Sequence, residues 1–178
     1  MKLRSVAILM AFAIVACGCS RTNSPTSEQE FVNTINHYRD MHESAGNNVQ
    51  RDAVIGARTA DLCSKFTPMV AQNWIGTIKN VDKTSVNGMG ILKIKISDNI
   101  TLLTPQNFLG ELKPEEMVPS RLMDFLSRQS EGTVIVFSGT FYPDKERCFR
   151  ELSITDAGSL DNPDFEFKFS SVGSPVQH

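Results

Sequence analysis

The sequence predicts an α+β protein: an N-terminal helical hairpin, then a small antiparallel β-barrel with one helix between its third and fourth strands. Apolar residues recur at helical spacing over residues 28–67. From residue 73 onward, apolar and polar residues alternate in short segments, as in half-buried strands. About 160 residues follow the apolar segment 1–16, which is enough for one domain with its own core.

Residues 28–72 are expected to form the helical part. Ser27 and Glu30 have the spacing of a capping box, which predicts a helix start at this point. The sequence SAGNN at 44–48 interrupts the apolar spacing, and Pro68 ends a second periodic stretch. The pattern therefore predicts a helical hairpin or two short packed helices.

The strands are expected within residues 73–172, in the segments 73–81, 90–100, 100–105, 132–142, 148–155 and 165–172. Asn87 and Gly88 favour a tight hairpin turn between the first two strands. Ser120 is expected to cap the short helix between the third and fourth strands. One core should contain the side chains that face inward, which we predict to be Trp74, Ile78, Val136, Phe167 and Phe169.

This order of elements resembles an OB-fold, a partly open five-stranded barrel with a helix between strands 3 and 4. The resemblance covers residues 73–172 and leaves 173–178 as a tail. Segment 165–172 would be a sixth strand, which departs from a minimal OB-fold. A different small barrel or a sandwich therefore stays open as an alternative.

Residues 1–16 have the layout of a secretory signal. Lys2 and Arg4 precede an uncharged apolar run that is too short to span a bilayer. The sequence IVAC at 14–17 resembles the bacterial lipobox, and this resemblance implies cleavage before Cys17 and attachment of a diacylglyceryl group and an acyl chain such as palmitate. An overlapping match, ACGC, makes Cys19 the alternative lipid site.

The expected compartment follows from the same resemblance. In the enteric sorting rule an Asp after the lipidated cysteine retains a lipoprotein at the inner membrane, whereas Gly18 follows Cys17. The resemblance thus implies a lipid-anchored protein of the outer membrane that faces the periplasm, with inner-membrane retention or surface display left open. Residues 17–27 contain Ser, Thr, Pro and charged residues, so we expect a flexible tether.

Four segments, NNVQRDA (47–53), NWIGTIKNV (73–81), VIVFSGTF (134–141) and ELSITDAGSLDNPDFEFKF (151–169), resemble those of uncharacterised bacterial lipoproteins and exported proteins. This resemblance supports the predicted fold and compartment and implies no activity.

Charge and cysteines limit the possible functions. Removal of residues 1–16 takes away Lys2 and Arg4 and no acidic residue, so the net charge falls from −2 to −4. A nucleic-acid-binding protein would have a basic excess, so we expect no nucleic-acid partner. Cys63 and Cys148 remain in the body of the chain. Export would favour a disulfide between them, although two buried free thiols stay open.

The sequence has no recognised catalytic or metal-binding motif, and we expect no enzyme activity, cofactor or metal. His37 and His42 are five residues apart and would lie on different sides of a helix. Ser138 lies within a strand pattern and lacks the context of a nucleophile elbow. Gly88 and Gly90 lack a phosphate-binding motif. The acidic residues of a polar, turn-rich loop do not have calcium-loop spacing: Asp156, Asp161, Asp164 and Glu166.

Three lysines form a possible binding face. If Leu92, Ile94 and Ile96 face the core, Lys93 and Lys95 point outward, and Lys79 on the preceding strand joins them. Such a face can bind an anionic chain or an acidic protein surface. It can equally be a solvated sheet face on which lysines prevent aggregation, and we favour this second interpretation.

The leading functional prediction is a lipid-anchored, non-catalytic interaction module that docks another envelope protein. An immunity or phage-exclusion role falls within this class. The alternative is a small exported enzyme that acts on a glycan or small ligand through an unrecognised site.

Overall fold

The computed structural model describes residues 24–84, 87–105, 113–153 and 155–175. Within them, the helices are α1 (Thr26–Glu43), α2 (Asn48–Lys65), the 3₁₀ helix η1 (Pro114–Glu116), α3 (Ser120–Leu126) and α4 (Asp156–Asp161). The strands are β1 (Val70–Lys83), β2 (Gly90–Lys95), β3 (Thr101–Leu103), β4 (Val134–Phe141), β5 (Pro143–Asp144), β6 (Cys148–Phe149) and β7 (Asp164–Gly173). Among the described residues, no helix has both the length and the apolar character needed to cross a bilayer.

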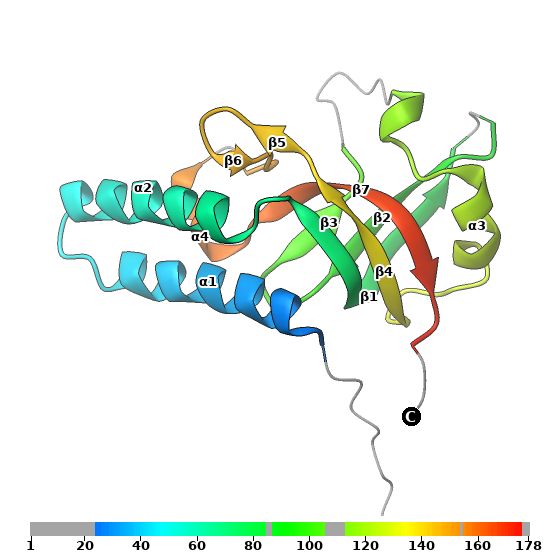
Figure 1. The fold of residues 1–178 in the computed structure, drawn as a ribbon, viewed down its shortest axis with the longest axis horizontal. Helices are drawn as coiled ribbons and strands as arrows, with labels where there is room; N and C mark the ends of the chain where they lie inside the picture. The colour runs from blue at the N-terminus through cyan, green and yellow to red at the C-terminus, as the bar shows by residue number, and fades with distance from the viewer. Residues whose placement is uncertain (1–23, 85–86, 106–112, 154, 176–178) are drawn as a thin grey trace, which may run out of the picture.

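Five strands form a closed barrel in the order β1-β2-β3-β7-β4 (Figure 1). β1 closes it, because its first half pairs with β4 and its second half pairs with β2. All neighbouring strands are antiparallel except β3 and β7, which are parallel. With α3 between β3 and β4, this is an OB-fold-like barrel, and the predicted α+β fold class is confirmed.

The segment after β4 differs from the prediction. Among the described residues of the expected strand 148–155, only Cys148 and Phe149 are in a strand, and they pair with β5 in a small hairpin outside the barrel. Cys148 has a φ of 68°, in the left-handed region, so the backbone departs from a regular extended path at this residue. β7 covers the expected sixth strand 165–172 and is the fifth strand of the barrel, because the expected strand 148–155 is not part of it. Part of the expected polar loop is helix α4, where the Thr155 hydroxyl accepts a hydrogen bond from the Gly158 N–H.

The helical hairpin is present, but the predicted capping box is wrong. Helix α1 starts at Thr26 after Pro25, without a side-chain cap. The hydroxyl of Ser27 instead accepts a hydrogen bond from Trp74 Nε1 on β1, at 3.1 Å. Helix α3 begins at Ser120, but the residue at its N-cap position is Pro119, so the predicted Ser120 cap is also wrong. Ser27 thus connects helix α1 to β1 instead of capping the helix.

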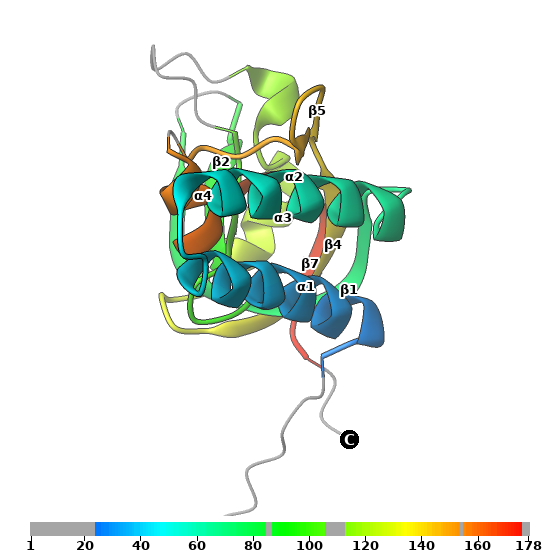
Figure 2. The same ribbon diagram turned by 90° about the vertical axis from the view of Figure 1, so that its left-hand side faces the viewer.

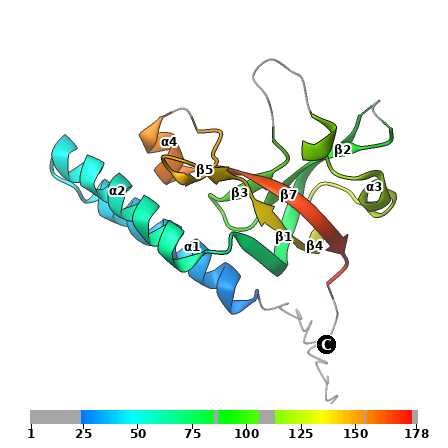
Figure 3. The same cartoon turned by 45° about the horizontal axis from the view of Figure 1, so that its top comes forward.

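Helices close both ends of the barrel. The hairpin of α1 and α2 lies across one end and α3 lies at the other (Figures 1 and 3). Phe31 of α1 is fully buried, and its ring centroid lies 5.0–5.9 Å from those of five other aromatic residues: Phe66, Trp74, Phe141, Phe149 and Phe165. At the α3 end the buried side chains are Leu122, Met123 and Leu126. The helices are therefore part of the same core as the barrel.

Four of the five predicted core residues are buried: Trp74, Ile78, Phe167 and Phe169. Val136 is an error, because it is half-buried on the outer side of β4, while its neighbours Ile135 and Phe137 face inward. The run Val134–Phe137 is apolar on both faces, so its alternation does not reveal which face is inside.

The far end of the helical hairpin extends beyond the barrel. All buried residues of α1 lie at or before Ile35, and all those of α2 lie at or after Val54. No residue from 36 to 53 is buried. In the view from the hairpin side, α1 and α2 lie side by side in front of the barrel (Figure 2), and in Figure 1 they extend past it. We call residues 36–53 the arm.

Candidate functional site

The three lysines of the predicted binding face lie on the outside of β1 and β2. Each is within 4 Å of a carboxylate: Lys79 Nζ of Glu131 (3.8 Å), Lys93 Nζ of Asp164 (3.1 Å) and Lys95 Nζ of Asp98 (3.0 Å). Leu92 and Ile94 are buried in the core as expected, whereas Ile96 is only partly buried and packs against it. The carboxylates offset the lysine charges, so this face is a mixed-charge surface and has no uncompensated cationic groove.

We therefore expect only weak binding of this face to anionic polymers. Binding of a heparin-like polymer to a soluble chain beginning at Ser27 should be detectable at low ionic strength and disappear near about 0.15 M salt. The measurement is a fluorescence titration at two salt concentrations, with the Lys79→Ala/Lys93→Ala/Lys95→Ala variant as control. Binding that persists at the higher salt and is lost in this variant would make the lysine face an anion-binding site.

A disulfide connects α2 to the hairpin of β5 and β6. Cys63 and Cys148 are bonded, with their Cα atoms 5.6 Å apart and a sequence separation of 85 residues. From the sequence, these two cysteines could have been either a disulfide or two free thiols, and the structure has the disulfide. It fixes the connection between β4 and β7 onto the helical hairpin.

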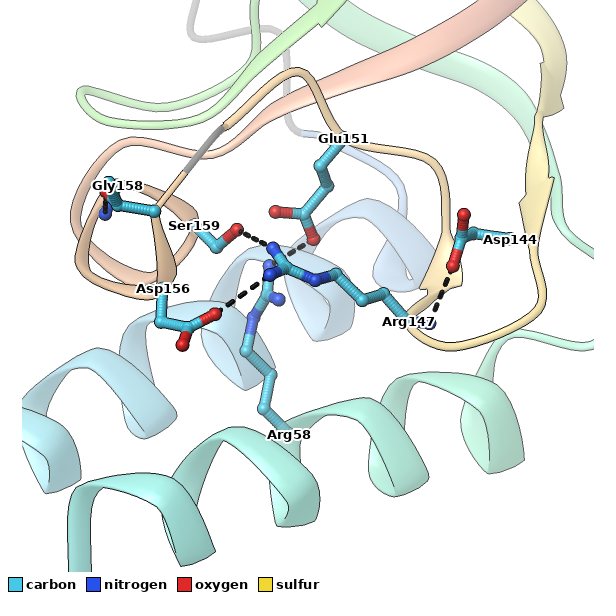
Figure 4. A network of polar contacts seen from close by, with 8 residues as sticks. Arg58, Asp144, Arg147, Glu151, Asp156, Gly158 and Ser159 are labelled. Carbon is cyan, nitrogen blue, oxygen red and sulfur yellow. Dashed lines mark hydrogen bonds and ion pairs between the residues drawn. The ribbon is translucent and has the colours of Figure 1, made fainter. Parts of the chain in front are cut away.

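A buried ion pair lies beside this disulfide. Arg58 of α2 extends toward Glu151, and its Nη2 is 2.8 Å from Glu151 Oε1 (Figure 4). Both side chains are at least 97% buried. Burial raises the pKa of Glu151, whereas the Arg58 guanidinium favours its ionised form. The Arg58 guanidinium also lies 5.6 Å from the centroid of the Phe165 ring.

Arg147 extends the polar network toward α4. Its guanidinium donates hydrogen bonds to the Ser159 hydroxyl and to Asp156 Oδ1, each at 2.8 Å (Figure 4). The Asp144 carboxylate accepts hydrogen bonds from the backbone N–H groups of Arg147 and Glu146, and these bonds lower the pKa of Asp144. The network holds the β5–β6 hairpin against α4.

A second cluster surrounds Arg150. Its guanidinium forms ion pairs with Glu116 of η1, at 3.2 Å, and with Glu166 of β7. It also lies 4.4 Å from the centroid of the Tyr142 ring. Burial, followed by the charge of Glu116, raises the pKa of the Tyr142 phenol. The cluster connects η1, β7 and the segment after β6.

Three of the four acidic residues that the sequence placed in a turn-rich loop are thus partners of basic side chains. Asp156 pairs with Arg147, Asp164 with Lys93, and Glu166 with Arg150. Sequence reasoning missed these pairs because their members come from distant segments; Arg58 and Glu151, for example, are 93 residues apart. Their chemistry is that of stabilising ion pairs.

The other sequence candidates are dispersed. His37 is exposed on α1 and its ring contacts Tyr38, while His42 lies in the last turn of that helix. In the described ranges, no three His, Cys, Asp or Glu side chains are grouped so as to hold a metal ion. Gly88 lies in the β1–β2 turn with a φ of 70°, and Gly90 begins β2. Cys17 and Cys19 lie outside the described residues.

An open cavity of about 340 Å³ lies between β1, β4 and β7. Its lining residues are Val70, Ala71, Gln72, Asn73, Ser138, Gly139, Thr140 and Ser170. The Ser138 hydroxyl, considered above as a nucleophile, accepts a hydrogen bond from the Asn73 N–H at 2.9 Å. Sequence reasoning missed this cavity because strand irregularities form it, and no residue motif marks it.

A buried carboxylate anchors α1 to β1. Glu28 is 2% exposed, and its Oε2 accepts a hydrogen bond from the Ile75 N–H at 2.7 Å. Burial raises the pKa of Glu28, although this hydrogen bond opposes the shift. The Glu28 carboxylate therefore satisfies the backbone N–H of Ile75 on β1. At neutral pH this arrangement buries a charge, which is unfavourable.

Glu28→Gln should stabilise the protein at pH 7 to 8 and have little effect near pH 4. The pKa of Glu28 is raised in the folded state, so its stabilising contribution is present below its ordinary pKa and is lost as pH rises through the folded pKa. Glutamine keeps an oxygen acceptor for Ile75 and carries no charge. Urea unfolding from pH 4 to 8 measures the difference, with the exposed Glu30→Gln as control. A Glu28→Gln protein less stable than wild type at pH 7 would contradict this account.

Comparisons with protein-family models, with curated proteins and with solved structures find no significant match for this chain.

Proposed function

We propose that this chain is a lipid-anchored, non-catalytic interaction module of the bacterial cell envelope, and that its arm docks another envelope protein. The anchor is the Cys17 lipid implied by the lipobox-like sequence IVAC, with Cys19 as the alternative. The proposed place is the outer membrane, facing the periplasm. An immunity or phage-exclusion role is compatible with this proposal.

The observation that carries the docking proposal is the arm. Its residues 36–53 extend two helices, and none of these residues is fully buried. Helical stability in proteins comes mainly from packing an apolar face, so an extension without a fully buried side chain adds little to the fold. A role outside the fold explains why the chain has it.

The chemistry of the arm tip suits contact with a protein. Met41 and Val49 lie near the α1–α2 connection, and they are two of the four large apolar side chains that are exposed in the described part of the chain. Val49 is 79% exposed. The residues from Ser44 to Gln50 carry no charge. Interface cores are depleted in charged residues and contain apolar anchors surrounded by polar groups.

The Cys63–Cys148 bond supports the proposed compartment. Disulfides persist in oxidising environments such as the periplasm and are rare in the cytosol. The bond also fixes α2 to the barrel connection, so the base of the arm is held rigidly. A rigid base fixes the direction in which the arm points.

Site-specific crosslinking in cells tests the docking proposal. A photo-reactive amino acid at Val49 should give one discrete adduct with an envelope protein, which mass spectrometry identifies. The same amino acid at Val134 is the matched control, since Val134 is an exposed valine on the barrel. Adducts from Val134 but none from Val49 would place the contact on the barrel and refute the role of the arm.

A further inference from the structure

Two irregularities in strand pairing, one on each side of β4, form the cavity between β1, β4 and β7. The β1–β4 register shifts between Ala71 and Trp74, which leaves Gln72 and Asn73 outside the regular pairing. The β4–β7 register shifts between Ser138 and Gly139, which leaves Ser170 outside it. Bulges re-aim side chains and interrupt ladder hydrogen bonds. Here they open a recess in an otherwise closed barrel wall.

The conformation of two residues maintains this recess. Asn73 has a φ of 55°, in the left-handed region that few residues other than glycine and asparagine adopt readily. Gly139 also lines the recess, and a Cβ atom at this position would collide with the backbone carbonyl of Lys168. β4 and β7 can therefore approach closely beside the recess.

The lining is polar, uncharged and free to bind. Gln72, Asn73, Thr140 and Ser170 are exposed, and their side chains form no hydrogen bond with any part of the chain that the structure describes. They provide two amides and two hydroxyls, so donors and acceptors are both present. Val70, which is 41% exposed, adds an apolar surface at the edge.

We propose that this cavity binds an N-acetylated sugar residue of a glycan chain. An amide side chain presents a donor beside an acceptor, which matches the C=O and N–H of an acetamido group. The two hydroxyl side chains match sugar hydroxyls, and Val70 can receive the acetyl methyl group. The volume of about 340 Å³ is at the small end of the range for ligand sites and suits one or two sugar rings.

Other ligand classes fit less well. An anion or cation would need a charged partner, and no charged side chain lines the cavity. An extended peptide would bind by adding a strand to a free sheet edge, but β1 and β4 pair with each other on both sides of the recess. The inference depends on these residues alone and is independent of the docking role of the arm.

Titration calorimetry on the full chain in detergent tests the proposal with tri-N-acetylchitotriose as the probe. Maltotriose has the same number of rings without acetamido groups, and N-acetyl-trialanine amide tests a peptide. Asn73→Gly removes the side-chain amide while glycine keeps the positive φ. The matched control is Asn87→Gly, because Asn87 has a φ of 48° in the distant β1–β2 turn. Gln72→Ala is a second variant of the cavity.

We expect saturable binding of tri-N-acetylchitotriose and weaker binding of maltotriose. Asn73→Gly and Gln72→Ala should each weaken the affinity by about fivefold for every hydrogen bond lost, with no change in Asn87→Gly. Absence of saturable binding, or equal loss in Asn73→Gly and Asn87→Gly, would overturn the proposal. Equal affinity for the trialanine peptide would also overturn it and assign the cavity to peptides.

Discussion

Replacement of Arg58 by methionine is expected to lower the free energy of unfolding by about 3–5 kcal/mol. The Arg58 guanidinium is the basic partner of Glu151, whose side chain is 1% exposed. Methionine fills much of the same space but leaves the Glu151 carboxylate buried without its ion-pair partner. Removing one member of a buried ion pair is far more costly than losing an exposed pair, which contributes at most about 1 kcal/mol.

Urea unfolding measures this loss, and the chain provides a matched control. Arg51→Met changes the same residue type on the same helix, but Arg51 is exposed and only its hydrogen bond to Asn48 is lost. The double variant Arg58→Met/Glu151→Leu should recover most of the stability, because it removes the unpaired charge. Equal losses in Arg58→Met and Arg51→Met would show that the buried pair does not stabilise the fold.

The Arg58→Met deficit should also shrink in acid. Burial already raises the pKa of Glu151, and loss of Arg58 removes the positive charge that opposes this rise. The folded variant then favours protonated Glu151, so the contribution of Glu151 to stability is fully present below its ordinary pKa of 4.5 and is lost as pH rises through the folded pKa. A deficit that is constant between pH 4 and 8 would contradict this explanation.

Removal of the disulfide is expected to lower the free energy of unfolding by about 4 kcal/mol. The bond closes a loop with a sequence separation of 85 residues, and opening it returns chain entropy to the unfolded state. The bond also secures the β5–β6 hairpin, whose two strands have only two residues each. This connection has little sheet pairing of its own to replace the bond.

Urea unfolding of the wild type with and without a thiol reductant gives this value. The Cys63→Ala/Cys148→Ala variant should match the reduced wild type, and a reductant should not affect it further. A wild type that unfolds at the same urea concentration in either condition would contradict the assigned contribution.

The sequence allowed the barrel to be predicted because its signals are local. Alternation defines β1 and β2, and the Asn87–Gly88 pair specifies the turn between them. Helical spacing defines α1 and α2, and the SAGNN segment separates them. Each of these signals lies within a few residues of the structure that it produces.

The errors arose where tertiary contacts outweigh local preference. The segment 148–155 has a strand-like composition, but the left-handed Cys148 and the ion pairs of Arg150 and Glu151 direct it away from the barrel. Ser27 resembles a helix cap, yet its hydroxyl binds Trp74. Such contacts join residues far apart in sequence, and no spacing pattern encodes them.

The candidate sites were less predictable than the fold. The outward direction of Lys93 and Lys95 followed from strand alternation, but their carboxylate partners Asp164 and Asp98 did not. The cavity depends on two register shifts that involve Asn73 and Ser170, and neither shift has a residue signature. The arm depends on where burial stops along α1 and α2, which only the packed structure defines.

Labelling of cells with radioactive palmitate tests most directly whether this protein is lipid-anchored. We predict that the wild type and Cys19→Ser incorporate label, and that their N-terminal fragment begins at residue 17 by mass spectrometry. Cys17→Ser should remain uncleaved and unlabelled, because the modified cysteine is both the lipid site and the cleavage marker. Label that persists in Cys17→Ser and is lost in Cys19→Ser would move the anchor to Cys19, and an unlabelled wild type would contradict lipid anchoring itself.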